Sequence, residues 1–181
     1  MLIVAQIIGI GAVALYLLSF QLKKRTHIVW VTFVSNMFYV LQYCLLGAFS
    51  GAIMDVLSTV ASFLAAKKNT PKLKKYATGI CLATILVVVA IGLTISVLQQ
   101  NWIELLPIAG TVFQVISLWC DDEQKLRKFG LCSAPFWLVY NFISQAYGAS
   151  VGSVLAMISI LTSLARYRKK AADMENNGCI G

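Results

Sequence analysis

Long apolar stretches alternate with short charged clusters along this chain. The stretches free of Asp, Glu, Lys and Arg are 1–22, 26–54, 56–66, 76–103, 105–120 and 129–165. A helix needs about 20 mainly apolar residues to cross a hydrocarbon layer of about 30 Å. Membrane β-strands would alternate apolar and polar residues, whereas these stretches are apolar on all sides. The pattern therefore predicts an all-α membrane protein.

The lengths of the stretches predict seven transmembrane helices. Residues 1–22, 76–98 and 103–120 each provide one helix. The block 26–66 contains a single charge and is about twice as long as one span, with a glycine-containing turn signal at 47–51. The block 129–165 is also long enough for two helices and has a similar signal at 147–152. Each of these two blocks is therefore expected to form a helical hairpin.

The positions of the charges predict the orientation. The chain has 15 Lys and Arg against 7 Asp and Glu, and every base lies within 23–25, 67–75, 125–128 or 166–170. With seven helices, these clusters share one face of the membrane. The positive-inside rule places that face and the C-terminus in the cytoplasm and the N-terminus outside. The clusters thus indicate topology and contacts with anionic lipid headgroups, and no nucleic-acid partner is expected.

An internal repeat is indicated when the chain is shifted by 101 residues, which pairs Gly47 with Gly148 and Gly51 with Gly152. The chain then divides into a first three-helix repeat (1–68), a cytoplasmic loop with linker helix (69–101), a second three-helix repeat (102–170) and a cytoplasmic tail (171–181). A single linker helix makes the two repeats parallel. Parallel repeats are typical of carriers with a substrate site at the repeat interface.

Polar side chains inside the predicted spans indicate which helix faces point inward, because they are costly against lipid. The second and sixth helices carry polar stripes at spacings of three and four residues. The candidate substrate-binding residues are Asn36, Tyr39, Gln42, Asp55, Ser58, Trp137, Tyr140, Asn141 and Ser159. Interhelical hydrogen bonding that only holds the bundle together is the alternative.

Asp55 is the one ionisable residue well inside a predicted span. It lies about 10 Å from the start of its helix at 1.5 Å per residue. Two roles fit such a carboxyl group. It either binds a solute hydroxyl or carries a proton, or it is protonated and donates a hydrogen bond to a neighbouring helix.

Pro107, Pro135 and Gly110 are candidate hinge residues of a rocking carrier. A proline inside a helix removes a backbone hydrogen bond and can bend the helix. Static kinks are the alternative.

Catalytic and metal-binding patterns are absent from the sequence. The five cysteines form no C-x-x-C, the single histidine His27 has no ligand-spaced partner, and there is no G-x-S-x-G and no phosphate loop. We therefore expect no enzyme, no catalytic residue, no cofactor and no metal.

Three segments carry a resemblance to a known family. Residues 103–111 (IELLPIAGT), 19–23 (SFQLK) and 45–48 (LLGA) resemble the YgjV-type bacterial inner-membrane protein family. That resemblance implies a multi-pass protein of the bacterial cytoplasmic membrane. The 3+1+3 arrangement also resembles the SWEET and PQ-loop superfamily, which implies alternating access around a central site.

Two functional hypotheses follow. The leading one is a carrier of a small polar, sugar-like or similar solute. The alternative is a non-transporting receptor-like or assembly subunit with the same fold. Homo-oligomers fit either hypothesis.

Overall fold

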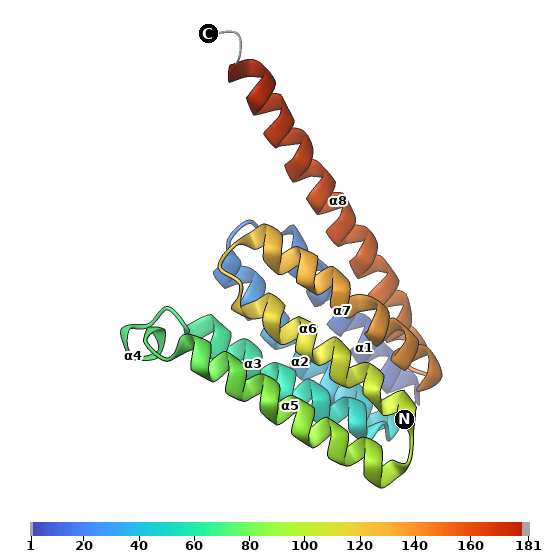
Figure 1. Ribbon diagram of the computed structural model, residues 1–181. Helices are drawn as coiled ribbons and strands as arrows, with labels where there is room; N and C mark the ends of the chain where they lie inside the picture. Colours follow the sequence, from blue (N-terminus) through green and yellow to red (C-terminus); the bar gives the residue numbers. More distant parts are fainter. Residues whose placement is uncertain (1, 179–181) are drawn as a thin grey trace.

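The computed structural model in Figure 1 describes residues 2–178, with side chains for 3–19, 21–71 and 73–166. Of the predicted cytoplasmic tail, residues 179–181 lie outside the described residues. The side chains of the basic positions 168–170 lie outside them as well.

Seven long helices account for most of residues 2–178, and no strand occurs among them. The long helices are α1 (Leu2–Gln21), α2 (Arg25–Leu46), α3 (Phe49–Lys67), α5 (Ala77–Gln99), α6 (Leu105–Trp119), α7 (Glu123–Ile143) and α8 (Tyr147–Gly178), with the short α4 (Pro71–Lys74) and the 3-10 turn η1 (Trp102–Glu104) between them. The all-α fold class is therefore confirmed, and both predicted hairpins are present as α2–α3 and α7–α8.

Local chemistry sets several helix ends. Gly47 ends α2 in the left-handed region at φ 73°, where its N–H bonds the Cys44 carbonyl. Asp122 starts α7 because its carboxylate accepts hydrogen bonds from the N–H groups of Gln124 and Lys125. This helix therefore begins six residues before the uncharged stretch that starts at residue 129. The last helix, α8, also extends past the predicted span, to Gly178.

The helices are arranged as a ring of six with α5 outside it. The helices α1, α2 and α3 contact one another in succession, as do α6, α7 and α8. Contacts between α3 and α6 and between α1 and α8 close the ring, and α5 packs against α6 and α3 at the edge of the bundle (Figure 1). We call the end where α1, α3 and α6 finish the basic end, since 23–25, 67–75 and 125–128 lie there. The other end is the far end.

The two halves of the ring correspond in a register of 98 residues. Corresponding helix ends and turns at this separation are Gln21 and Trp119, Arg25 and Glu123, Gly47 and Gln145, and Phe49 and Tyr147. Ser35 donates to the Ala12 carbonyl and Ser133 to the Gly110 carbonyl, each at 2.8 Å. The register of 101 residues predicted from the glycine pairs is therefore wrong by three residues. Gln145, at φ 59°, occupies the turn position that Gly47 occupies in the first half.

Polarity is distributed for a lipid environment, with polar side chains inside and large apolar ones outside. Ser35, Asn36 and Asn141 are buried, whereas Leu86 and Leu98 are mostly exposed. Among the described residues, five helices are long and apolar enough to cross a membrane: α2, α3, α5, the η1–α6 segment Trp102–Trp119 and the Tyr147–Arg166 part of α8. A shorter apolar helix, Ile3–Ser19, lies within α1, and α7 carries four charged residues in its first six positions.

Close helix contacts depend on individual glycines. A Cβ atom on Gly152 would lie 2.2 Å from the Val13 side chain, so α1 and α8 approach each other closely at this point. A Cβ atom on Gly51 would lie 2.9 Å from the Tyr140 ring. Gly47 has open space around it and serves the turn instead.

Replacing Gly152 with alanine is expected to destabilise the protein by about 2 kcal/mol, because the added methyl group overpacks the α1–α8 contact. Gly79→Ala is the matched control, since a Cβ atom there meets nothing within 4 Å. Thermal unfolding of both variants in detergent tests this expectation. Equal unfolding midpoints for the two variants would contradict it.

Candidate solute site

A small cavity of about 40 Å³, lined by several polar and aromatic side chains, lies at the centre of the helix ring. Its lining residues are Tyr16 from α1, Asn36, Tyr39 and Tyr43 from α2, Asp55 from α3, Gln114 from α6, Ala134, Trp137 and Asn141 from α7, and Ser153 and Ala156 from α8. All six ring helices therefore contribute side chains. A cavity of this size holds about three water molecules.

Corresponding positions in the two halves face each other across the cavity. Ten of the eleven lining residues form five pairs separated by 98 residues: Tyr16 and Gln114, Asn36 and Ala134, Tyr39 and Trp137, Tyr43 and Asn141, and Asp55 and Ser153. The cavity therefore lies on the approximate symmetry axis that relates the two halves. The chemistry is nevertheless asymmetric, because only one wall carries a carboxyl group.

Asp55 supplies that carboxyl group and is almost fully buried, at 4% exposure. It is the seventh residue of α3, about 9 Å from the start of the helix. Among the described side chains, the one salt bridge joins Lys68 to Asp121, so Asp55 has no ionic partner there. Nor does any described group donate a hydrogen bond to its carboxyl oxygens. The Asp55 carboxyl group therefore lines the cavity without a hydrogen-bond or ionic partner among the described side chains.

Two hydrogen-bond networks connect the helices around the cavity. In the first, Gln114 donates to Asn36 at 3.4 Å and Asn36 donates to Ser62 at 3.3 Å, which joins α6, α2 and α3. In the second, Tyr43 donates to Asn141, which donates to Ser153 at 3.5 Å and so joins α2, α7 and α8. Polar residues of both stripes therefore bond between helices and also line the cavity. Their binding of a solute stays a prediction.

Aromatic rings form one wall. The ring of Tyr43 stacks on Tyr39 at a centroid distance of 6.4 Å and on Trp137 at 6.3 Å. Tyr140 contacts Tyr43 and Trp137 edge-on, at 6.3 and 6.0 Å. The stack extends from the cavity toward the far end.

Five of the nine predicted substrate-binding residues meet at the cavity, namely Asn36, Tyr39, Asp55, Trp137 and Asn141. The other four lie elsewhere. Gln42 is buried against Gly9 of α1, and Ser58 is buried outside the lining. Tyr140 lies at the far end, and Ser159 accepts a hydrogen bond from Gln21 near the basic end.

Tyr140 lies next to the aromatic wall of the cavity, on its side toward the far end. Its hydroxyl bonds Ser50 Oγ at 2.7 Å and accepts the Gly51 N–H at 2.9 Å. Gly51 is the third residue of α3, and its N–H has no partner within that helix. Beyond the aromatic wall lies a second, wider hollow of about 590 Å³, whose lining includes Tyr140, Glu104 and Gln145. We call this hollow the vestibule.

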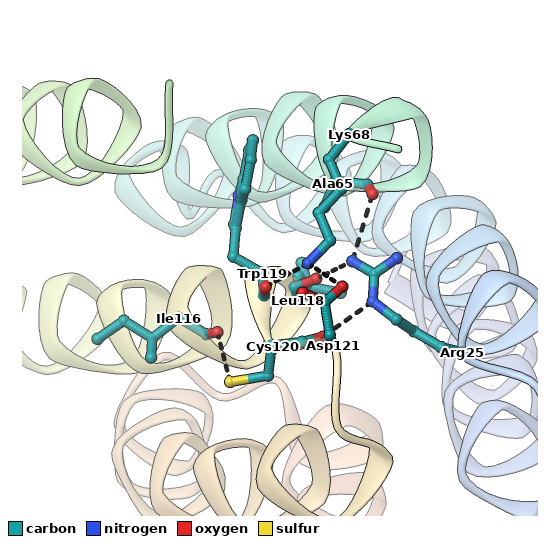
Figure 2. Close-up of polar contacts among 8 residues, drawn as sticks. All are labelled: Arg25, Ala65, Lys68, Ile116, Leu118, Trp119, Cys120 and Asp121. Carbon is teal, nitrogen blue, oxygen red and sulfur yellow. Dashed lines mark hydrogen bonds and ion pairs between the residues drawn. The ribbon is translucent and has the colours of Figure 1, made fainter. Parts of the chain in front are cut away.

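A cluster of charged side chains joins α2 and α3 to the end of α6 at the basic end (Figure 2). Arg25 of α2 donates to the carbonyls of Cys120 at 2.8 Å, Leu118 at 2.5 Å and Ala65 at 3.3 Å. Lys68, just after α3, donates to the Trp119 carbonyl at 2.5 Å and pairs with Asp121 at 2.7 Å. We call Arg25, Lys68 and Asp121 the basic-end clamp.

The clamp satisfies the C-terminal carbonyls of α6, which carries no basic residue in its own last turn. Asp121 is mostly exposed, and the hydrogen bond from Lys68 holds the pKa of its carboxyl group below the ordinary value. Because this pKa is lowered in the folded state, the pair stabilises the protein at neutral pH. That contribution is lost as the pH falls through the folded-state pKa.

The predicted hinge residues have different surroundings. Pro107 is the third residue of α6, where no N–H bond within the helix is lost, so it does not interrupt that helix. Pro135 lies inside α7 and removes a backbone hydrogen bond there. Gly110 permits close packing, since a Cβ atom would lie 2.8 Å from the Trp137 ring. A hinge motion at these residues stays a prediction.

Several site residues were missed in the sequence. Tyr16 and Gln114 line the cavity and correspond to each other in the 98-residue register. A signal for both exists, because each is a polar residue within an otherwise apolar span. The clamp residues Arg25 and Lys68 were interpreted as topology signals alone, because the carbonyls they bind belong to α6 and have no sequence signature.

The fold and its distribution of polar residues define a polytopic helical membrane protein. The chain belongs to the Imp-YgjV family, described as a bacterial inner membrane protein, whose sequence model matches residues 3–171. It is thus a multi-pass protein of the bacterial inner membrane. Neither the curated proteins nor the solved structures contain a match.

Proposed function

We propose that this protein is a carrier that moves a small polar solute across the inner membrane by alternating access. The main support is the central cavity, to which six helices from both halves contribute polar side chains. Burying so many polar groups is costly in a bilayer unless they bond one another or a solute. Asp55 adds to this support, because its carboxyl group forms no described bond that would hold two helices together.

The proposal assigns one closure to each end of the helix ring. Tyr140 separates the cavity from the vestibule at the far end, and the basic-end clamp joins α2 and α3 to α6 at the other end. Alternating access then requires the two closures to open in turn. The Tyr140 contact joins α7 to α3 and the clamp joins α6 to α2 and α3, so each closure links the two halves.

The membrane arrangement forms part of the proposal. We propose seven spans, with α1 and α7 included, and by the positive-inside rule we assign the basic end to the cytoplasm and the vestibule to the outside. The triplets α1–α3 and α6–α8 are then parallel repeats joined by α5, an architecture like that of SWEET and PQ-loop carriers. Basic residues at the cytoplasmic face contact anionic lipid headgroups.

Uptake into liposomes that contain the purified protein tests the proposal. The solutes are radiolabelled sugars, amino acids and nucleobases together with small cations, and we expect saturable uptake of at least one. Ala134→Leu, which fills the cavity, is expected to abolish that uptake. Ala83→Leu, on an exposed face of α5, is the matched control and keeps it.

Two results together would favour a receptor-like or assembly subunit instead: no solute shows saturable uptake, and a partner protein purifies together with the chain. Uptake that Ala134→Leu leaves unchanged would show that the solute does not pass through this cavity.

A further inference from the structure

We infer that the solute carries a positive charge, on a small group of the ammonium or guanidinium type, and that Asp55 is its counter-ion. This inference rests on the proposed carrier function and specifies its substrate class. It follows from three features of the described residues: the unpaired carboxyl group, the charge of the route toward it, and the aromatic wall beside it.

Asp55 is buried, with 4% of the residue exposed, and it lines a cavity whose lining includes no basic side chain. Burying an isolated carboxylate costs several kcal/mol unless a cation or hydrogen-bond donors accompany it. No described side chain forms a salt bridge or a hydrogen bond with the Asp55 carboxyl group. A cationic solute supplies both the opposite charge and N–H donors, so binding it offsets the cost of burying Asp55.

The route from the far end is acidic as well. Glu104 lines the vestibule and is 7% exposed, and its Oε2 has no hydrogen-bond partner among the described residues. No Lys or Arg lines either the vestibule or the cavity. Carboxylates along a narrow polar path favour cations and exclude anions. Glu104 and Asp55 would therefore bind a cation one after the other as it moves inward from the far end.

The aromatic wall suits an organic cation. Tyr39, Tyr43 and Trp137 stack beside the cavity, and ring faces of this kind attract ammonium and guanidinium groups. The cavity of about 40 Å³ limits the bound group to a few non-hydrogen atoms in this conformation. A planar guanidinium ion meets both conditions, because it stacks on aromatic faces and donates hydrogen bonds to a carboxylate.

Guanidinium and urea provide a matched pair of probes, since they share shape and size and differ in charge. Millimolar guanidinium chloride is expected to raise the thermal unfolding midpoint of the purified protein in detergent, with sodium chloride as the ionic control. Urea at the same concentration is expected to have no such effect. In liposomes, counterflow of labelled guanidinium is expected to be saturable, whereas urea enters as it does in empty liposomes.

Asp55→Asn is expected to weaken guanidinium binding about a hundredfold, because the amide keeps the shape and removes the charge. Asp55→Glu is expected to retain binding in part. Glu123→Gln, at the basic end of α7, is the matched control and leaves binding unchanged. Adding Ser153→Asp to Asp55→Asn places a carboxylate at the corresponding position of the other half and is expected to restore binding.

The outcomes separate this inference from the carrier proposal. Binding of guanidinium that depends on Asp55 without any counterflow would support the cationic ligand and contradict the carrier. Saturable uptake of a neutral solute, with neither guanidinium nor ammonium bound, would leave the carrier standing and overturn the cation. Equal binding by wild type and Asp55→Asn would also overturn it, since the carboxyl group would then act in its neutral form.

Discussion

Replacing Arg25 with alanine is expected to lower the free energy of unfolding by about 3 kcal/mol, a large effect for one side chain outside the central packing. The guanidinium group bonds three carbonyls, two at the end of α6 and one at the end of α3. Alanine removes the side-chain donor from the Leu118 and Cys120 carbonyls, whereas the Ala65 carbonyl keeps the N–H of Lys68. It also removes a cation from the negative end of the α6 dipole.

Thermal or denaturant unfolding in detergent measures this effect. Lys24→Ala is the matched control, because Lys24 is exposed and its side chain has no hydrogen bond or ion pair among the described residues. Arg25→Lys is expected to lose stability to an intermediate extent, since an ammonium group keeps the charge but lacks the planar fork that reaches several carbonyls. A loss no larger than that of Lys24→Ala would show that the clamp is not a structural closure.

The helices themselves were predictable, because hydrophobic length and charge position are strong signals in membrane proteins. The start of α7 was not, since a charged first turn at the membrane surface lies outside any uncharged stretch. The register of the two halves was also missed. Gly148 and Gly152 match Gly47 and Gly51 in the sequence, yet the structure places them three residues further along.

A three-residue error preserves most of the site prediction, because positions three or four residues apart share one face of a helix. Asn36, Tyr39 and Asn141 were therefore placed correctly on inward faces. Gln42 and Ser159 share those faces but lie at other depths. Depth along the membrane depends on helix tilt and on contacts between helices, which a sequence pattern does not contain.

The contacts proposed to close the two ends of the cavity were not predictable from the sequence either. The Tyr140 hydroxyl bonds the backbone of Gly51, and the clamp bonds the backbone of α6. Backbone groups are present at every position, so no residue type marks them as partners. Such contacts become visible only when the helices are placed against one another.

Replacing Tyr140 with phenylalanine is expected to open the cavity toward the vestibule and to cost about 2 kcal/mol of stability. The change removes one oxygen atom and keeps the ring. It leaves Ser50 Oγ without its partner from α7 and the Gly51 N–H, an unpaired donor in the first turn of α3, without a cap. Loss of these two hydrogen bonds weakens the contact between α7 and α3, and the retained ring leaves no void.

Cysteine labelling in nanodiscs distinguishes opening of the cavity from a general loss of stability. With the five native cysteines replaced, Ala134→Cys places a thiol at the cavity wall. Adding Tyr140→Phe is expected to raise the rate at which this thiol reacts with a polar maleimide about tenfold, which corresponds to a shift of about 1.4 kcal/mol toward the open form.

Tyr147→Phe is the matched control, because Tyr147 is exposed and its hydroxyl bonds no described group. An unchanged labelling rate in Tyr140→Phe, together with lowered stability, would reduce Tyr140 to a helix cap, and the closure at the far end would then have to lie elsewhere in the aromatic stack.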